Sequence, residues 1–442
     1  MPGLATRLER EQGRPLSAEE IFEITRARET SLSRLLVVYI TTGLFFMLLP
    51  GTFLGVWNLL AISARHAADS VTPAWIQAHG HAQIFGWIGT FILGIGFYSI
   101  PKLRRSDPFA LFIPWVCWAL WTSGVAARWL TNVYQWHWRW MLPLSATLEV
   151  AAFLIFFATV SGHRSKESEP LQPWVLVVAA AATGLLLNLL VNLGATLYLA
   201  VRAVGPAFPP EFDQRYLVLS TWGFLVPFVW GFSAKWLPVF LGLRPVRERA
   251  LLGAVALNSL GVLAALAGWM TLAAGALLTG MVVACGALRL FEAPQQSAKV
   301  KGVHRSFPAF VRVAYLWAMV AAALGMCAVF SAKAQGIWGA SRHALTVGFL
   351  ATMAFCIGQR VLPAFSGMRL LFSTKLMFLG LLLLTAGCLL RVSSEILAYQ
   401  GFAGWAWSWL KVSAIAEMTA VTIFAVNLLC TFGSRPTGPA PV

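Results

Sequence analysis

Long apolar runs separated by short polar or basic stretches dominate the sequence. Each run is close to the roughly 20 residues that a helix needs to cross the hydrocarbon core of a bilayer. The narrowest separation is the Gly268-Trp269-Met270-Thr271 stretch between the seventh and eighth runs. The pattern predicts an all-α polytopic membrane protein with twelve transmembrane helices, over residues 35–62, 75–101, 109–130, 141–161, 173–201, 216–240, 249–269, 271–290, 309–332, 341–363, 373–395 and 408–432.

The two ends of the chain follow other patterns. Residues 1–33 are charged, and within them residues 17–30 are predicted to form a short amphipathic helix whose Ser17 and Glu20 fit a capping box. Residues 34–433 are predicted to form the transmembrane domain. Residues 434–442 are rich in Pro and Gly, which predicts a disordered tail.

Composition excludes an ordinary soluble domain. The chain of 442 residues is 58% hydrophobic and 11% charged, whereas soluble domains average about 25% charged residues. The six cysteines are scattered and form no CxxC pair, so neither a disulfide framework nor a zinc knuckle is expected.

The basic residues that give the net charge of +16 lie in short loops between the spans and do not form a nucleic-acid-binding face. When each of the 33 Lys and Arg residues is assigned to the nearer side, 24 fall on the side of the termini and 9 on the other. The positive-inside rule then predicts both termini in the cytoplasm. We expect a multi-pass protein of the bacterial inner membrane, with lipid as its partner and no nucleic acid.

Three spans end in the same way. The second, sixth and tenth close at Pro101, Pro238 and Pro363, and a basic loop follows each. A recurrence every four helices suggests three arcs of four helices around a pseudo-threefold axis. The simpler alternative is that proline ends many helices of any fold.

Histidines are the most informative polar residues within the spans. His79 and His81 lie early in the second span and His343 lies early in the tenth, which places all three near the outer end of the bundle. Ionisable residues within membrane spans are energetically costly, so they are candidates for a functional site. One imidazole from each of two helices can hold a heme iron from both faces. His79 and His81 point about 200° apart on a helix, so only one can face a shared cofactor. Hydrogen bonding between helices is the alternative for each.

Other intramembrane polar residues invite weaker interpretations. Glu149 and Glu417 can be interpreted as proton carriers, as partners of a buried base, or as structural acids. Asn188 and Asn192 share a helix face and are expected to bond across helices. Three outer cations are ordinary loop charges or partners of heme propionates, namely Arg128, Arg139 and Arg342. Four histidines are predicted to lie in solvated loops, namely His66, His137, His163 and His304.

Two of these segments resemble a known family. His79-Gly80-His81-Ala82-Gln83-Ile84-Phe85-Gly86-Trp87 resembles the HxHxxxFG(F/W) segment of the NnrS family, and Arg342-His343-Ala344-Leu345-Thr346-Val347-Gly348 resembles its RHALTVG segment. The layout is also similar to subunit I of the heme-copper oxidases and nitric oxide reductases. In those enzymes, histidines that match His79 and His343 bind a low-spin heme.

The departures from the oxidase pattern bear on function. Ser341 occupies the place of the histidine that binds the oxygen-reactive heme, and the span 216–240 contains no histidine for copper. The resemblance therefore implies one bis-histidine heme without a heme-copper reaction centre. Copper has been associated with the NnrS family, yet the sequence offers no clear set of ligands for it.

The sequence as a whole predicts an NnrS-type membrane protein. His79 and His343 would ligate one b-type heme, with His81 as an alternative or neighbouring group. The resemblance implies redox or ligand chemistry connected with nitric oxide metabolism and nitrosative stress, and leaves open whether the protein is an enzyme. Two other classes remain open: a transporter or structural bundle without heme, and an electron-transfer subunit that works with a respiratory partner.

Overall fold

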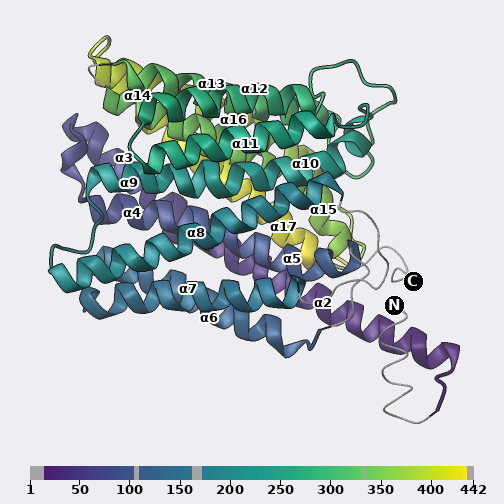
Figure 1. Cartoon of the computed structure of the whole chain (residues 1–442). Coiled ribbons are helices and arrows are strands. Elements are labelled where there is room, and N and C mark those ends of the chain that lie inside the picture. The colour runs from purple at the N-terminus through teal and green to yellow at the C-terminus, as the bar shows by residue number, and fades with distance from the viewer. Residues whose placement is uncertain (1–13, 104–108, 162–171, 332–333, 436–442) are drawn as a thin grey trace.

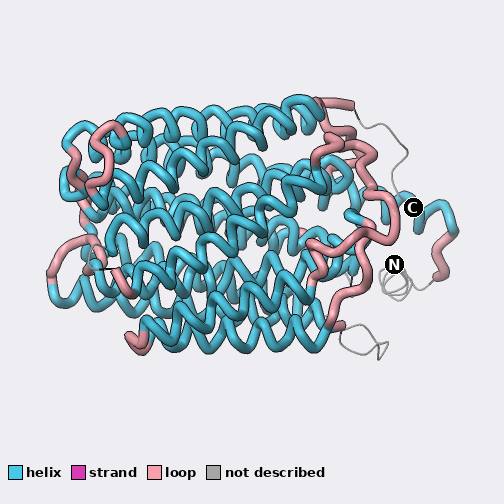
Figure 2. The backbone as a smooth tube through the Cα atoms, turned by 90° about the horizontal axis from the view of Figure 1, so that it is seen from above, coloured by secondary structure: helices cyan, strands magenta, loops and turns pink. Residues whose placement is uncertain are grey.

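The chain folds into a bundle of roughly parallel and antiparallel helices (Figure 1). The structure is a computed structural model and describes residues 14–103, 109–161, 172–331 and 334–435. Within these ranges all regular secondary structure is helical, and loops gather at the two ends of the bundle (Figure 2). The predicted all-α class is therefore confirmed.

Over the residues that the structure describes, the helices form twelve columns, and four columns consist of consecutive helical segments. Those four each contain a π-helical segment in the middle, labelled η. In chain order the segments of the twelve columns are α2 (Ala18–Phe46), η1 (Met47–Phe53) and α3 (Leu54–Arg65); α4 (Pro73–His81), η3 (Ala82–Gly89) and α5 (Thr90–Leu103); α6 (Phe112–Tyr134); α7 (Trp138–Ser161); α8 (Pro173–Arg202); α9 (Pro210–Val218), η4 (Leu219–Leu225) and α10 (Val226–Leu241); α11 (Glu248–Leu266); α12 (Met270–Ala287); α13 (Phe307–Val329); α14 (Ala334–His343), η5 (Ala344–Ala351) and α15 (Thr352–Phe365); α16 (Thr374–Gln400); and α17 (Ala406–Gly433).

Eleven of the columns within the described residues are long and apolar enough to cross a membrane. The remaining column, α6, has 23 residues and runs beside α7 (Figure 1). Its tryptophans and Arg128 lower its mean hydropathy, which explains why it is less apolar than the other columns. The predicted boundary between the seventh and eighth spans is confirmed at Ala267-Gly268-Trp269, where Gly268 has a φ of +87°.

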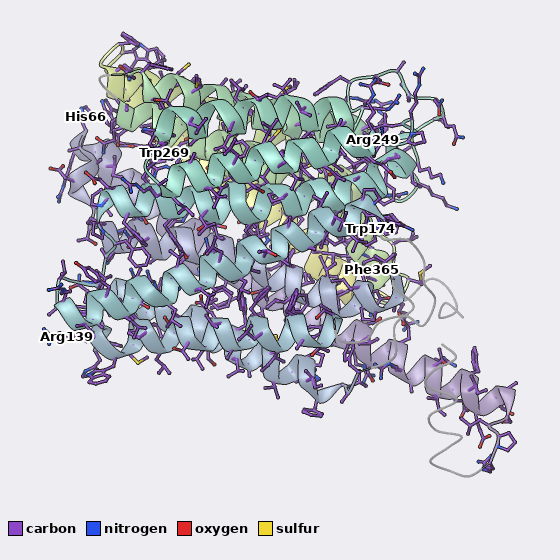
Figure 3. The ribbon with its side chains drawn as sticks, viewed as in Figure 1. His66, Arg139, Trp174, Arg249, Trp269 and Phe365 are labelled. Atoms are coloured by element: carbon purple, nitrogen blue, oxygen red, sulfur yellow. The ribbon has the colours of Figure 1, made fainter. Side chains whose placement is uncertain are left out.

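The start of α2 and the end of α17 lie at the same end of the bundle (Figure 1). Trp174, Arg249 and Phe365 lie at that end as well, whereas His66 and Arg139 lie at the other (Figure 3). An even number of crossings produces this arrangement. Which end faces the cytoplasm stays a prediction.

Several helix boundaries differ from the sequence prediction by a few residues, and two of the differences concern the N-terminal helix and the candidate site. The helix expected over 17–30 is the beginning of the long helix α2, although the predicted capping box of Ser17 and Glu20 is present. The tenth column begins at Ala334 rather than at 341, because the stretch before His343 is helical but only weakly apolar. His343 is therefore the last residue of α14 and lies about 15 Å along the column. His163 and most of the predicted tail, 434–442, fall outside the described residues.

The π-helical segments bear on the candidate site. Two of them begin directly after histidines of interest: η3 follows His81 and η5 follows His343. A π turn is wider than an α turn and occurs often at functional sites. Both widened segments lie in the buried interior, where Phe85 and Phe349 are almost completely covered.

Candidate functional site

His79 projects from α4 toward the first column. Its Nδ1 lies 2.9 Å from the carbonyl oxygen of Gly51. Because a carbonyl can only accept a hydrogen bond, this contact assigns the proton to Nδ1 and leaves the lone pair on Nε2. Gly55 makes room for the ring, since a Cβ at this position would stand 2.5 Å from Cε1 of His79.

His343 repeats this arrangement on the tenth column. Its Nδ1 lies 2.9 Å from the carbonyl oxygen of Gly339 and 3.2 Å from Oε2 of Glu395 on α16. Both neighbours are acceptors, so Nδ1 carries the proton and Nε2 keeps its lone pair here too. The side chain is 28% exposed although its helix lies within the bundle.

The two imidazoles lie within electrostatic range of each other, and Arg391 lies within the same range of His79. Neither Nε2 has a hydrogen-bond partner in the described part of the chain. Two nitrogen lone pairs, each fixed in orientation by a backbone carbonyl, are the donor set that a bis-histidine heme requires.

His81 occupies a different environment from His79. Its Nε2 lies 2.8 Å from Oε1 of Glu149 on α7, and both side chains are buried. The nitrogen that stays without a partner in His79 and His343 is therefore engaged in His81. The expectation that Glu149 partners a buried base agrees with this contact.

The surroundings of His343 include two charged residues of α16 that were not predicted, together with Glu417, which was already a candidate. Glu395 and Arg391 lie one turn apart on α16, with 3.4 Å between Arg391 Nε and Glu395 Oε2. Glu417 on α17 interacts electrostatically with His343 and Arg391. Charged residues within the apolar stretch 373–395 were the signal that could have identified this group, since such residues are rare inside membranes.

Arg128 was expected to be a loop charge or a propionate partner, and the structure places it inside the bundle. It is 2% exposed, its guanidinium carbon lies 4.8 Å from the centre of the Phe208 ring, and it interacts electrostatically with Glu149 and Asp213. Arg342 is half-buried near Gln214, and Arg139 is exposed. Burial of Arg128 among acids makes it part of an internal polar cluster.

The remaining predicted polar residues fall where expected or nearby. Asn188 donates a hydrogen bond across helices to Ser220 Oγ at 2.6 Å, whereas Asn192 has no hydrogen-bond partner among the described side chains and backbone. His66 ends α3 and stacks on Trp407, and His304 lies in a loop beside Ser306. His137 lies in the loop before α7.

Ser341, at the place of the second heme ligand of the oxidases, donates a hydrogen bond to the Ala321 carbonyl at 2.8 Å. In the described ranges, no group of three or more His, Cys, Asp and Glu side chains could hold a metal ion. Heme needs only two protein ligands, so the lack of a three-residue group does not bear on His79 and His343.

The fold is similar to that of a solved structure. A heme-copper terminal oxidase dimer determined by cryo-EM matches with a TM-score of 0.54 and 12% sequence identity, covering 93% of this chain and 85% of that chain. At this identity the likeness shows the fold alone. It agrees with the predicted oxidase-like bundle of four-helix arcs.

Comparison by sequence gives a narrower result. No curated protein matches this chain. A family model described as a domain of unknown function (DUF8744) matches residues 210–431, which are half of the chain and include His343. The protein therefore belongs to the DUF8744 family.

Proposed function

We propose that this membrane protein holds one b-type heme between His79 and His343. The supporting observation is that both Nδ1 atoms lie 2.9 Å from backbone carbonyl oxygens, which leaves both Nε2 atoms free to bind iron. When bound, the heme would supply one-electron redox chemistry. No CxxCH motif is present, so covalent attachment of the c type is not expected.

The protein contributes the orientation and charge of the ligands. Gly51 and Gly339 fix the two rings through their carbonyls, and Gly55 gives the His79 ring its space. Glu395 adds a carboxylate beside His343 alone, so the two ligands differ in basicity. With two histidines as ligands, the iron would have no free position, which favours electron transfer over the binding of a gas unless one ligand leaves.

The resemblance of the two histidine segments to the NnrS family supports a finer role. We propose redox or ligand chemistry connected with nitric oxide metabolism and defence against nitrosative stress. The oxidase-like fold also suits an electron-transfer subunit that receives electrons from a respiratory partner. A transporter or a structural bundle without heme is the alternative from another class.

The visible spectrum of the purified protein tests the heme proposal. Protein from heme-replete cells should show a sharp reduced α-band that both His79→Ala and His343→Ala abolish. His66→Ala is the matched control, because that ring stacks on Trp407 at the end of α3. A colourless wild-type protein would contradict the proposal, and a spectrum unchanged by His79→Ala would transfer the ligand role to His81.

A further inference from the structure

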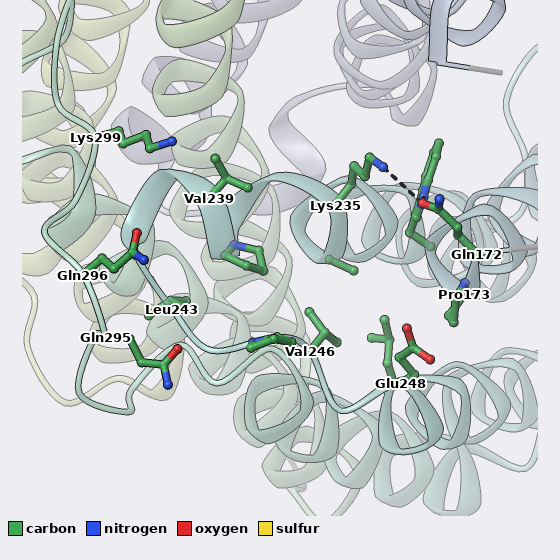
Figure 4. A pocket seen from close by; sticks show the side chains of 16 residues that line it. Gln172, Pro173, Lys235, Val239, Leu243, Val246, Glu248, Gln295, Gln296 and Lys299 are labelled. Carbon is green, nitrogen blue, oxygen red and sulfur yellow. Dashed lines mark hydrogen bonds between the residues drawn. The ribbon is translucent and has the colours of Figure 1, made fainter. Parts of the chain in front are cut away.

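A cavity opens at the end of the bundle where α2 begins and α17 ends, well away from the histidine pair. It has a volume of about 560 Å³ and lies between the start of α8, the end of α10 and the start of α11 (Figure 4). The loop 295–299 closes its fourth side. None of its lining residues contributes to the proposed heme site, so its purpose must be sought separately.

The cavity wall depends on a glycine. Gly242 ends α10 with a φ of +67°, and its carbonyl accepts hydrogen bonds from the backbone N–H groups of Gln295 and Gln296. A Cβ on Gly242 would stand 2.1 Å from the carbonyl oxygen of Gln296. The loop can therefore lie against the helix end only because this residue has no side chain.

The polar part of the lining favours an anion. Lys235 donates a hydrogen bond to Oε1 of Gln172 at 3.1 Å and stands 5.3 Å from the centre of the Trp174 ring, so its ammonium group is held in place (Figure 4). Lys299 extends from the loop on the other side (Figure 4). The cavity also receives the N-terminal ends of α8 and α11, which carry partial positive charge. Glu248 is the acidic side chain of the lining.

The rest of the lining is apolar. Val239, Leu243 and Val246 face the same cavity as the two lysines, and Val239 is 47% exposed. A soluble anion would leave this apolar wall without a partner. An amphipathic molecule, with an anionic head and hydrocarbon chains, would use both kinds of surface.

We propose that the cavity binds the phosphodiester headgroup of an anionic phospholipid. Lys235 and Lys299 contact the phosphate, and the glycerol and first acyl carbons lie against Val239 and Val246. The position supports this assignment, because the cavity lies at the ends of membrane-spanning helices, where lipid headgroups are found. The proposal does not depend on the heme.

Binding can be measured on the full-length protein in detergent by native mass spectrometry. Phosphatidylglycerol should bind more tightly than phosphatidylcholine with the same acyl chains. The double variant Lys235→Gln/Lys299→Gln should bind phosphatidylglycerol roughly tenfold to thirtyfold more weakly, since each lysine near a lipid surface contributes a severalfold gain. Lys301→Gln/Lys375→Gln removes the same charge outside the cavity and should bind like the wild type.

Two further arms separate the sources of phosphate and locate the lipid. Inorganic phosphate at millimolar concentration should leave bound phosphatidylglycerol in place; displacement by phosphate would show a site for the free ion instead. A photoactivatable phosphatidylglycerol should crosslink to residues 172–174, 235–251 or 295–299. Equal binding of both lipids, an unaffected double variant, or crosslinks confined to other segments would each overturn the proposal.

Discussion

The two proposed heme ligands differ in what their Nδ1 atoms contact. His79 meets a backbone carbonyl, whereas His343 meets both a carbonyl and the carboxylate of Glu395. A carboxylate partner makes an imidazole a stronger electron donor and stabilises oxidised iron. The structure thus assigns to one residue, Glu395, a specific influence on redox behaviour.

Glu395→Gln should raise the heme midpoint potential while leaving heme bound. The expected shift is on the order of 60 mV, the one-electron equivalent of about 1.4 kcal/mol, which is the scale of one contact with a charged group. A spectroscopic redox titration measures it. Glu149→Gln is the matched control, because its carboxylate contacts His81 rather than a ligand, and it should change the potential much less. Equal shifts in both variants would contradict a specific role for Glu395.

The buried pair of His81 and Glu149 leads to a prediction about stability. His81→Ala should destabilise the protein by about 3–5 kcal/mol, because the carboxylate of Glu149 would stay buried without its partner. The double variant His81→Ala/Glu149→Ala should recover much of this loss. Thermal unfolding in detergent, followed by circular dichroism, gives the comparison. If the losses of stability in His81→Ala and in Glu149→Ala add up to the loss in the double variant, the pair is not coupled.

Single residues were predictable from the sequence to different degrees. A second-column histidine and a tenth-column histidine were expected to share one site because both interrupt apolar runs, and their role as a ligand pair stays a proposal. Glu395 and Arg391 were not singled out, since their contact with His343 depends on how α16 packs beside α14. Arg128 was interpreted as a loop charge or a propionate partner, and its burial was missed because its helix contains enough polar and aromatic residues to obscure its depth.

At the scale of helices, close approach of α3 to α4 positions His79. A Cβ at Gly55 would stand 2.5 Å from Cε1 and 2.7 Å from Nδ1 of the ring. Gly55→Ala should therefore displace His79 and lower heme retention roughly tenfold, the smaller end of effects seen for groups that orient metal ligands. Heme content per protein, measured by pyridine hemochrome, tests this.

Gly253→Ala provides the control, because a Cβ on that glycine of α11 meets nothing within 4 Å. It should leave heme content and the spectrum unchanged. Full heme retention in Gly55→Ala would show that His79 does not need the space that Gly55 leaves for its ring, and would weaken the ligand assignment.

Helix boundaries were less predictable than helix number. Apolar runs identify where a chain crosses the membrane, so the twelve columns followed from hydropathy. The segment from Ala334 to Arg342 is helical yet only weakly apolar, and its inclusion carries His343 deeper along its column than expected. The π-helical segments also escaped prediction, because they depend on packing against neighbouring columns.

For the whole molecule, the distribution of basic residues leads to an orientation prediction. The helix ends nearest both termini lie at the end to which the sequence pattern assigns 24 of the 33 Lys and Arg residues, so we expect that end in the cytoplasm. A fluorescent protein fused after Val442 should fold and fluoresce. Alkaline phosphatase inserted after Ala203, in the loop between α8 and α9 at the opposite end, should be active. The reverse pattern of reporter activities would invert the topology.

The imidazoles of His79 and His343 lie within electrostatic range of each other but come from opposite halves of the sequence. On the proposed ligation, the first half of the chain provides one iron ligand early in synthesis, and the second ligand emerges only after nine columns are complete. Stable heme retention would thus be a late event in biogenesis. A chain that stops before α14 should insert into the membrane yet lose its heme during purification, so that pigment content becomes a measure of finished assembly.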